Sequence, residues 1–492
     1  METVAILNVV QNKGAARIWM QGNTLRRAGF EPRTNYEVRN KEGAIVCVKT
    51  DIGVKLRQVS SRVRNEKETP IIDLNNAAIS AMLEGFTRVK AVFREGEIYI
   101  VPLASEIRAK ERLDDARRTM AAGRPLTFGS LAHGGGILSH ALETGFTLEK
   151  VASALKFANE YRDDLIHHAL AHNPIWNKDT IALQGPMQEL CSDLYVQRII
   201  GRVHVLEAGL PCSGASLAGR AKRGLKHPEA HPEVGHLVYA FLRFIEVINP
   251  CVILLENVVQ YLNTASMDII RNHLRDNCYE VYETQVSGAD FNCLEDRHRM
   301  CMVAVTRGMP SAPSVPFSFS DLVFPEKVER TLGDIMEPIA LDDPRWSPMA
   351  GLKDKQTRDA ENGNNFKMQV FTARHTSVAN HTKGMAKNRS TDPKYQHPEN
   401  PELLRVPTPI EHARVKDIPE ALIEGLCTST AHELLGQSIC YPPFVAIGRL
   451  IARWFIALRD LEETEMSICA DLLAEAVIAK AKREARQAEL QK

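Results

Sequence analysis

The sequence lacks the features of a disulfide scaffold, a zinc site or a membrane protein. Its ten cysteines in 492 residues are scattered and form no Cys-x-x-Cys pair, so we expect reduced thiols in a cytoplasmic protein and no metal centre. No apolar run reaches the ~18 residues of a membrane span. The N-terminus has no basic flank leading into such a run, so no signal peptide is expected either.

Net charge is also absent, because 61 Lys and Arg balance 61 Asp and Glu. Bulk electrostatics therefore indicates no partner, but the charge is unevenly distributed. Residues 1–126 hold 22 basic and 15 acidic side chains, and residues 365–395 hold six and one. Two basic regions around a neutral middle are typical of a protein that binds a polyanion, although a solvated charged surface explains them equally well.

The first hundred residues contain a repeat. Segments 17–48 and 70–101 each pass from a strand pattern through an amphipathic turn or helix to a Gly-Phe pair, and each ends in two strands joined by a Glu-Gly turn. Glycine suits such turns because it accepts positive φ without steric cost. The repeat predicts a β-rich accessory domain over residues 1–103. It loosely resembles the swapped-hairpin DNA-binding folds of bacterial transition regulators and antitoxins, and a plain accessory domain fits equally well.

Beyond the repeat the character of the chain changes several times. A charged stretch predicts a helical linker, and short apolar strands then alternate with helical stretches, as in a doubly wound α/β sheet. A region rich in Pro, Asn and Asp interrupts this alternation and indicates an insertion. The expected boundaries are 104–125 for the linker, 126–307 and 405–458 for the two parts of the α/β core, 308–404 for the insertion, and 459–492 for a surface helix.

Candidate cofactor-binding residues follow the first strands of the core. The stretch "LTFGSLAHGGGILSHALETGF" runs from a strand through glycines to a helix, so Gly134 and Gly136 would let a ligand approach the backbone at a helix N-terminus. Glu160 is expected after a second strand, where an acid would hold a ribose diol. Asp179 is expected at the end of a third strand near an adenine, and a solvated loop acid is an equally good interpretation of it.

Three further strand ends carry reactive side chains. Cys212 follows a proline after an apolar strand, and Glu256 ends the buried strand "PCVILLENV". Arg297 and Arg299 stand two apart on a predicted strand, hence on one face. A lone cysteine of this kind usually packs in a core. Cysteine, carboxylate and an arginine pair on successive strand ends instead favour one site at the crevice of an open α/β sheet.

In this order the motifs resemble those of the cytosine-5 DNA methyltransferases of bacterial or phage type. That family carries Phe-x-Gly-x-Gly, Pro-Cys, Glu-Asn-Val and Gln-x-Arg-x-Arg motifs. A variable target-recognition region separates these from Thr-Pro-x-Glu-x-Ala-Arg and Gly-Asn-[Ser/Ala]-Val motifs. The resemblance covers about residues 126–458. The chain reads "AHGGG" at Ala132, "GLPCSGAS" at Gly209, "ENV" at Glu256, "EDRHR" at Glu295, "RVPTPIEHARVKDIPE" at Arg405 and "LLGQSICYPPFVAIGRLIA" at Leu434.

The chain departs from the family pattern at three positions. Ala132 stands where the family has an aromatic residue, Glu295 where it has glutamine, and Gln437 where it has asparagine. Ala132 would weaken packing against an adenosine. Glu295 would bring a charge near the DNA-facing site. Neither departure affects the expected nucleophile, Cys212.

The resemblance implies a Rossmann-like class I methyltransferase domain with an inserted target-recognition region, S-adenosyl-L-methionine as cofactor and double-stranded DNA as partner. It implies that Cys212 attacks C6 of a flipped-out cytosine and that Glu256 hydrogen-bonds N3 and the exocyclic amine. Arg297 or Arg299 would favour the thiolate. The cofactor would lie on the predicted cofactor residues, with the site closed from the C-terminal segment by Gln437 and Ser438.

Two other functions remain open at the level of sequence. One is the tRNA-directed branch of the same fold, which the long insertion and the N-terminal repeat disfavour. The other is a DNA-binding regulator with a degenerate methyltransferase domain, which Ala132 and Gln437 favour and the intact catalytic motifs oppose. A restriction endonuclease partner is compatible with the sequence. The target sequence and the oligomeric state are not indicated.

Overall fold

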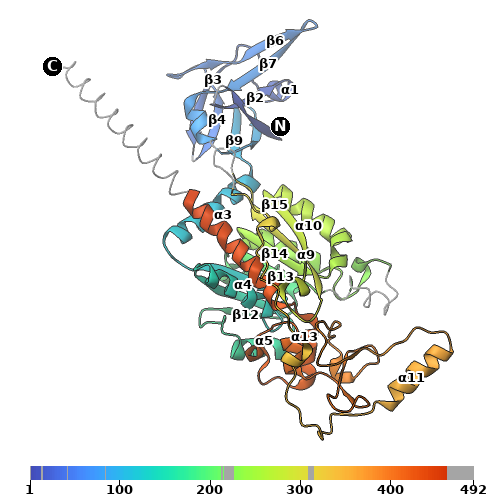
Figure 1. Cartoon of the computed structure of the whole chain (residues 1–492). Coiled ribbons are helices and arrows are strands. Elements are labelled where there is room, and N and C mark those ends of the chain that lie inside the picture. Colours follow the sequence, from blue (N-terminus) through green and yellow to red (C-terminus); the bar gives the residue numbers. More distant parts are fainter. Residues whose placement is uncertain are drawn as a thin grey trace. The chain divides into compact units, whose positions relative to one another are not determined.

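The computed structural model describes residues 2–12, 15–41, 43–83, 85–211, 214, 226–308 and 315–461. The chain divides into two compact units, which are described separately here (Figure 1). The first comprises Met1–Asp114, Asp276–Tyr279 and Thr306–Val315, and the second the remainder. Within the described ranges no single helix is long and apolar enough to cross a membrane. One pair bent by 50°, Thr428–Gln437 with Tyr441–Leu461, meets that test only when its two members are taken together.

The first unit is built on a nine-stranded antiparallel sheet in the order β5-β3-β4-β9-β8-β1-β2-β7-β6. The large N-terminal sheet confirms the predicted β-rich fold. The charged stretch that follows it forms a helix, α3 (Ala104–Ala121). The strands are β1 (Thr3–Asn12), β2 (Ala15–Gln21), β3 (Asn35–Lys41), β4 (Ala44–Lys49), β5 (Arg57–Gln58), β6 (Ser60–Arg64), β7 (Lys67–Leu74), β8 (Arg88–Arg94) and β9 (Glu97–Pro102).

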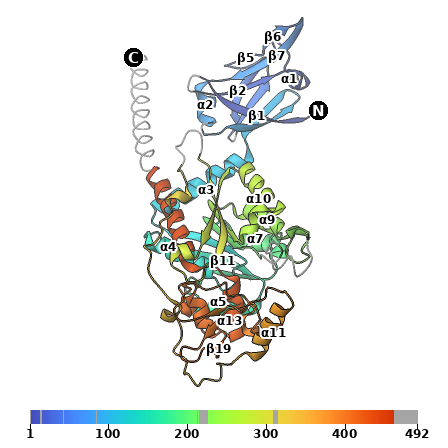
Figure 2. The same ribbon diagram turned by 45° about the vertical axis from the view of Figure 1, so that its right-hand side comes forward.

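The sequence repeat corresponds to a repeated order of elements. Strand β2, helix α1 (Asn23–Arg27) and the hairpin β3–β4 correspond to β7, α2 (Ala77–Met82) and the hairpin β8–β9. Equivalent strands pair antiparallel, β2 with β7 and β4 with β9, as a pseudo-twofold axis requires. Gly43 and Gly96, at the two equivalent turns, have φ of 82° and 73°. In Figure 2, β1, β2 and β7 lie side by side with α1 and α2 on either side.

The two edges of this sheet are joined by one residue. Strand β5 ends at Gln58 and β6 begins at Ser60, yet the two strands stand at opposite ends of the strand order. Val59 between them is buried, and its backbone pairs with that of residues 33 and 34 at 2.8 and 2.9 Å. The sheet therefore curls back on itself. A curled sheet leaves little open edge. The apolar core of this unit lies inside the curl.

The second unit contains a seven-stranded sheet in the order β12-β11-β10-β13-β14-β16-β15. The first five strands in this order are parallel, and β16 is antiparallel to β14. This confirms the predicted doubly wound α/β sheet. The strands are β10 (Leu126–Leu131), β11 (Ser153–Glu160), β12 (Ile181–Gln184), β13 (Val205–Gly209), β14 (Val252–Asn257), β15 (Tyr279–Ser287) and β16 (His298–Thr306).

Helices cover both faces because the strand order reverses between β10 and β13. Right-handed crossovers place the helix after β10 and the helix before β14 on opposite faces, as α4 and α9 show in Figure 1. The last described helix, Tyr441–Leu461, packs on α4 through Gly145 and Gly448, where an added Cβ would meet backbone at 2.4 and 2.6 Å. The helices of this region are α4 (Ile137–Leu148), α5 (Asp163–His172), α6 (Met187–Leu190), α7 (Leu194–Ile200), α9 (Leu237–Ile248) and α10 (Ala265–Asp276).

The insertion after β16 has little regular structure. It contains helix α11 (Ala350–Glu361) and a three-stranded sheet of β17 (Val370–Phe371), β18 (Lys394–Gln396) and β19 (Leu404–Arg405). Helices α12 (Pro409–Arg414) and α13 (Thr428–Gln437) return the chain to the α/β core. A small apolar cluster joins the insertion to the α/β core. Its buried members are Leu294, Leu332, Ile335, Val378, Tyr395 and Val415.

Candidate active site

The carboxyl ends of β10, β11, β13 and β14 meet at one edge of the parallel sheet. The reversal of strand order between β10 and β13 opens a ligand crevice at this edge. Gly134, Gly136, Glu160 and Glu256 all lie there, as predicted. The two glycines are in the loop after β10, Glu160 ends β11, and Glu256 is the second-last residue of β14. Cys212 comes three residues after β13 but lies outside the described residues.

The glycine loop after β10 is held by Glu160, the last residue of β11. Its Oε2 accepts the backbone N–H of Gly134 at 2.7 Å, and its Oε1 accepts that of Arg162 at 2.9 Å. Gly134 and Gly136 have φ of 56° and 75°, which glycine adopts without strain. The loop therefore presents its backbone at the start of α4, beside a buried carboxylate.

A second residue that holds this loop, Asn173, is not apparent in the sequence. Its Nδ2 donates to the carbonyls of Gly135 and Gly136 at 3.0 and 3.1 Å. On the other side lies Leu434 of α13, 2.8 Å from where a Cβ on Gly135 would stand. A larger residue at position 135 would therefore clash. Nothing distinguishes Asn173 from an ordinary helix-terminal asparagine in the sequence.

The predicted closing residues lie at the end of α13. Gln437 is the last residue of this helix and is exposed. Ser438 is half-buried, and its hydroxyl donates to the carbonyl of Leu435 at 2.8 Å. The end of α13 lies at the glycine loop, and Leu434 of this helix is the residue that contacts it.

Asp179 is not at the end of a strand, and that prediction is wrong. It is exposed and lies in the turn before β12, where its N–H donates to Asn177 Oδ1 at 2.9 Å. In a parallel sheet the start and the end of a strand lie at opposite edges, so Asp179 is far from the crevice. The strand ends instead at Gln184, and Gly185 after it donates its N–H to the Glu160 carbonyl at 3.0 Å.

Glu256 and Arg299 form an ion pair at the crevice. Arg299 Nε lies 2.9 Å from Glu256 Oε1. Burial raises the pKa of Glu256, and the charges of Arg299 and Arg297 oppose that shift. A carboxyl whose pKa is perturbed in this way at a crevice suits a group that exchanges a hydrogen bond or a proton with a base.

Arg297 does not share a strand face with Arg299, because β16 begins only at His298. Its guanidinium instead contacts Glu295 at 3.3 Å and donates to the Gly436 carbonyl at 2.8 Å. The sequence suggests that Glu295 brings a charge near the DNA-facing site. The structure corrects this, because Glu295 is fully buried and does not lie on an open surface. Its Oε2 lies 3.8 Å from Lys416 Nζ, and this buried counterion offsets the cost of an acid in place of glutamine.

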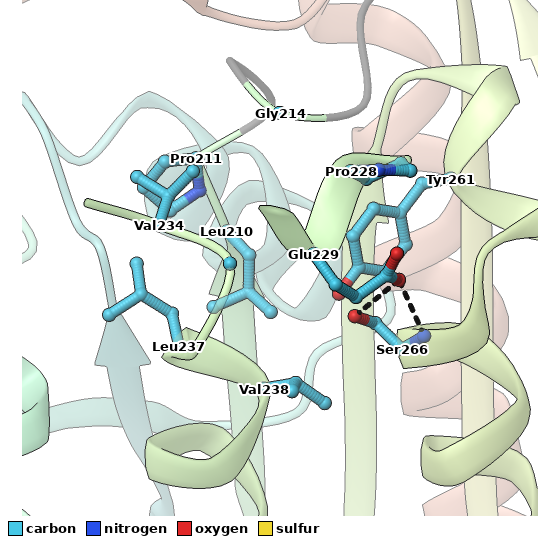
Figure 3. Close-up of a pocket in the computed structure, with 11 residues that line it drawn as sticks. Leu210, Pro211, Gly214, Pro228, Glu229, Val234, Leu237, Val238, Tyr261 and Ser266 are labelled. Carbon is cyan, nitrogen blue, oxygen red and sulfur yellow. Dashed lines mark hydrogen bonds between the residues drawn. The ribbon is translucent and has the colours of Figure 1, made fainter. Parts of the chain in front are cut away.

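The backbone that leads to Cys212 is held by Asn257, the second residue of the Glu-Asn-Val motif. Asn257 Nδ2 donates to the Leu210 carbonyl at 3.0 Å. Pro211 and Gly214, on either side of Cys212, line a small cleft (Figure 3). Across the cleft the carboxylate of Glu229 accepts hydrogen bonds from the N–H and hydroxyl of Ser266 at 2.8 and 2.9 Å, which fixes that wall.

Most of the predicted basic segment in the insertion is open to solvent. Five of its six cations are exposed, namely Lys367, Arg374, Lys383, Lys387 and Arg389. Lys394 differs, because it is fully buried and its ammonium donates to the carbonyls of Arg389 and Asp392 at 2.9 and 3.0 Å. His381 is buried too. These two residues organise the segment and do not contact solvent.

Across the ranges that the structure describes, no group of three His, Cys, Asp or Glu side chains is arranged to hold a metal ion.

A seven-stranded sheet of this order, with a glycine loop after its first strand, defines the class I methyltransferase fold. Solved structures agree. The Dnmt2 methyltransferase of S. pombe superposes with a TM-score of 0.52 at 16% identity, covering 68% of this chain and 99% of that one. The Entamoeba histolytica methyltransferase EhMeth gives 0.52 at 15%, covering 67% and 98%. At such identities the likeness shows the fold alone.

The family follows from the sequence match. The model of the C-5 cytosine-specific DNA methylases matches residues 130–453, so the chain belongs to that family and is a DNA cytosine-5 methyltransferase. It is 26% identical over 269 residues to the type II methyltransferase M.NlaX of Neisseria lactamica, covering 52% of this chain and 78% of that protein. It is 26% identical over 255 residues to M.SsoII of Shigella sonnei, covering 50% and 63%.

Proposed function

We propose that the chain transfers a methyl group from S-adenosylmethionine to C5 of a cytosine in a specific sequence of double-stranded DNA. In this proposal the base is flipped out of the helix and forms a transient bond from C6 to Cys212. The observation that carries the proposal is the buried ion pair of Glu256 and Arg299, which stands at the sheet edge where β13 leads to Cys212.

The crevice fits an adenosyl cofactor. Gly134 and Gly136 form a cradle at positive φ that larger side chains would fill, and Asn173 and Leu434 fix its walls. Glu160 lies beside the cradle with a carboxylate suited to a ribose diol. When bound, S-adenosylmethionine supplies an electrophilic methyl group. The residues of the chain bind it, orient it toward the base and exclude water.

The catalytic residues make C5 nucleophilic. Addition of the Cys212 thiolate to C6 forms a C–S bond and moves the ring electrons toward C5. Glu256 hydrogen-bonds N3 and the exocyclic amine and so stabilises the charge that develops during addition. Once C5 carries the methyl group, loss of its proton to a base and departure of the Cys212 thiolate restore the aromatic ring.

Target selection is assigned to the insertion. A cytosine within a duplex cannot reach the crevice, so it must leave the base stack. The exposed Lys367, Arg374, Lys383, Lys387 and Arg389 supply charge for phosphate contacts, which position the protein, while groove edges supply the sequence information. Because its curated relatives are named type II methyltransferases, a restriction endonuclease with the same target is the partner to test.

The proposal is tested by bisulfite sequencing of DNA from cells that express the chain, beside a Cys212→Ser control. We expect protected cytosines at one recurring sequence with the natural chain and none with the variant. Equal protection in both would contradict a catalytic role for Cys212. If DNA is unprotected, bisulfite sequencing of tRNA from the same cells decides whether RNA is the substrate.

A further inference from the structure

The first unit carries an exposed two-stranded ribbon that has no role in the proposed chemistry. The ribbon, residues 61–70, consists of β6 and the first part of β7, and its last pair is Arg64–Lys67. Strand β7 pairs with β2 only from Ile71 onward, so the ribbon is two strands wide and projects from the rest of the sheet (Figure 1). Its residues 61–67 are all exposed.

One face of the ribbon carries three cations and no acid. Side chains alternate between the two faces of a strand, so Arg62 and Arg64 share a face with Lys67 and Thr69, the residues opposite them. Glu68 lies on the other face, where its carboxylate accepts a hydrogen bond from the Ser61 hydroxyl at 2.6 Å. Glu66 lies in the turn at the tip. Within the described residues none of the three cations forms an ion pair, so their charge is available to a partner.

The three cations do not support the fold. Arg64 and Lys67 stand directly opposite each other, and like charges in such a pair destabilise a sheet. The turn that joins them needs no cation either. Its residues, Asn65 and Glu66, have φ of 50° and 59°, which is the backbone conformation of a tight two-residue hairpin. A binding role explains why the cations are nevertheless placed together.

The pseudo-twofold repeat provides an internal comparison. The β1–β2 hairpin is equivalent to the β6–β7 hairpin, because β2 corresponds to β7 and two residues join the strands in each case. Its last pair is Asn12–Ala15. The residues that take the places of the three cations are all neutral, namely Val10, Asn12 and Ala15. The same pairing therefore forms without the cations, and they distinguish one hairpin from the other.

Duplex DNA fits this ribbon in shape and in charge. The major groove of DNA accepts a two-stranded β-ribbon, whereas side chains cannot read the deep and narrow major groove of A-form RNA. Alternate residues of a strand lie about 6.8 Å apart, which is twice the ~3.4 Å between successive phosphates along one DNA strand. Arg62 and Arg64 therefore match phosphates two nucleotides apart. Because the chain belongs to a family of DNA methylases, duplex DNA is also the polyanion that it meets.

We propose that the β6–β7 ribbon is a second DNA-binding element, which lies in the major groove and contacts phosphates through Arg62, Arg64 and Lys67. This goes beyond the proposed function, which assigns the DNA contacts to the insertion. Phosphate contacts carry no sequence information. The ribbon therefore adds affinity for any duplex and leaves the choice of target to the insertion.

The test is binding of the full chain to a fluorescently labelled DNA duplex of arbitrary sequence, measured by anisotropy at several salt concentrations. The triple variant Arg62→Val, Arg64→Asn, Lys67→Ala has the residues of the β1–β2 hairpin at these places, so it should fold. Each phosphate contact contributes about 0.9 to the slope of log K against log salt. We therefore expect a slope shallower by about 2.7 and a dissociation constant higher by about tenfold or more at physiological salt.

The matched control replaces three other exposed cations of the first unit with glutamine, namely Lys41, Lys49 and Lys90, and should keep the natural slope. Replacement of all three ribbon cations with glutamine is the second variant, in case the first does not fold. An unchanged slope in either folded variant overturns the proposal, and so does an equal change in the control.

Double-stranded RNA of the same length serves as a competing partner in this assay. An equal change of slope with RNA would overturn the assignment to the major groove of DNA. If the natural chain protects cytosines from bisulfite while the slope is unchanged in the variant, this inference alone fails. If the natural chain binds no duplex DNA at any salt concentration, the inference and the proposed substrate fail together.

Discussion

Nε of Arg299 lies 2.9 Å from Oε1 of Glu256, and this ion pair joins β16 to β14 at the edge of the sheet that leads to Cys212. The side chains are only 12% and 11% exposed, so salt screens their interaction weakly. Two opposing effects act on Glu256, since burial raises its pKa and the two arginines lower it. Their balance sets the pH range over which the carboxyl keeps a proton.

Replacement of Arg299 with glutamine should move the pH dependence of methylation. Without its nearest cation the pKa of Glu256 rises further, so Glu256 stays protonated to higher pH and the alkaline limb of the pH–rate profile moves upward. The rate at neutral pH should fall about 10²–10³-fold, the usual cost of a lost electrostatic contact in a reaction centre. The measurement is kcat against pH with a duplex that carries the target. Glu256→Gln should remove the limb, and a limb at its natural position in Arg299→Gln would contradict this role.

Asn257→Ala should impair chemistry more than folding. Asn257 is 1% exposed, and its amide holds the Leu210 carbonyl two residues before Cys212. Loss of this bond leaves a buried acceptor unsatisfied, at about 1–3 kcal/mol of stability. Displacement of Cys212, the proposed nucleophile, by about 1 Å would cost roughly 10²-fold in rate. Single-turnover methyl transfer and urea unfolding separate the two effects. Asn364→Ala, an exposed asparagine, is the control, and a rate equal to that of the control would show that Asn257 only supports the fold.

Glu160 and Asp179 make a matched pair for the cofactor site. Both are acids that the sequence assigns to it, but only Glu160 lies at the crevice, bonded to Gly134. Glu160→Ala should weaken S-adenosylmethionine binding by about tenfold or more, since a hydrogen bond to a charged group contributes about 1.5–3 kcal/mol. Asp179→Ala should change it less than about twofold, as exposed substitutions usually do. The affinities are measured by titration calorimetry. An equal loss of affinity in both variants would show that Asp179 also contributes to the cofactor site.

These two acids show why sequence reasoning succeeded in one place and failed in another. An apolar run fixes which strands are buried, and the end of a parallel strand fixes the edge of the sheet, so Glu160 and Glu256 are predictable. Strand boundaries are less certain than strand existence. An error of a few residues in a strand boundary places Asp179 at the wrong edge of the sheet. The same kind of error places Arg297 on β16, which begins one residue later, at His298.

Long-range contacts within the second unit carry no local signal. Asn173 reaches the glycine loop from the end of α5, and Lys416 reaches Glu295 over more than one hundred residues of chain. No periodicity in either segment announces these partners.

Glu295 and Lys416 should stabilise the protein as a pair. Burial alone would raise the pKa of Glu295, but the charge of Lys416, with His381 and Arg297, lowers it to about 2. Because the folded pKa lies below the ordinary value, this stabilisation is present above about pH 4.5 and is lost as the pH falls toward 2. Burial lowers the pKa of Lys416 to about 7 although the charge of Glu295 raises it, so Glu295→Gln should lower this pKa further and leave Lys416 neutral at pH 7. The variant should lose the stabilisation of the pair, at most about 3–5 kcal/mol. Lys416→Met in the same chain should recover most of that loss, because it removes the buried amine that has lost its partner. Urea unfolding at pH 7 of the natural chain, the two single variants and the double variant measures the coupling. A double variant that loses the sum of both single losses would show that the two residues act independently.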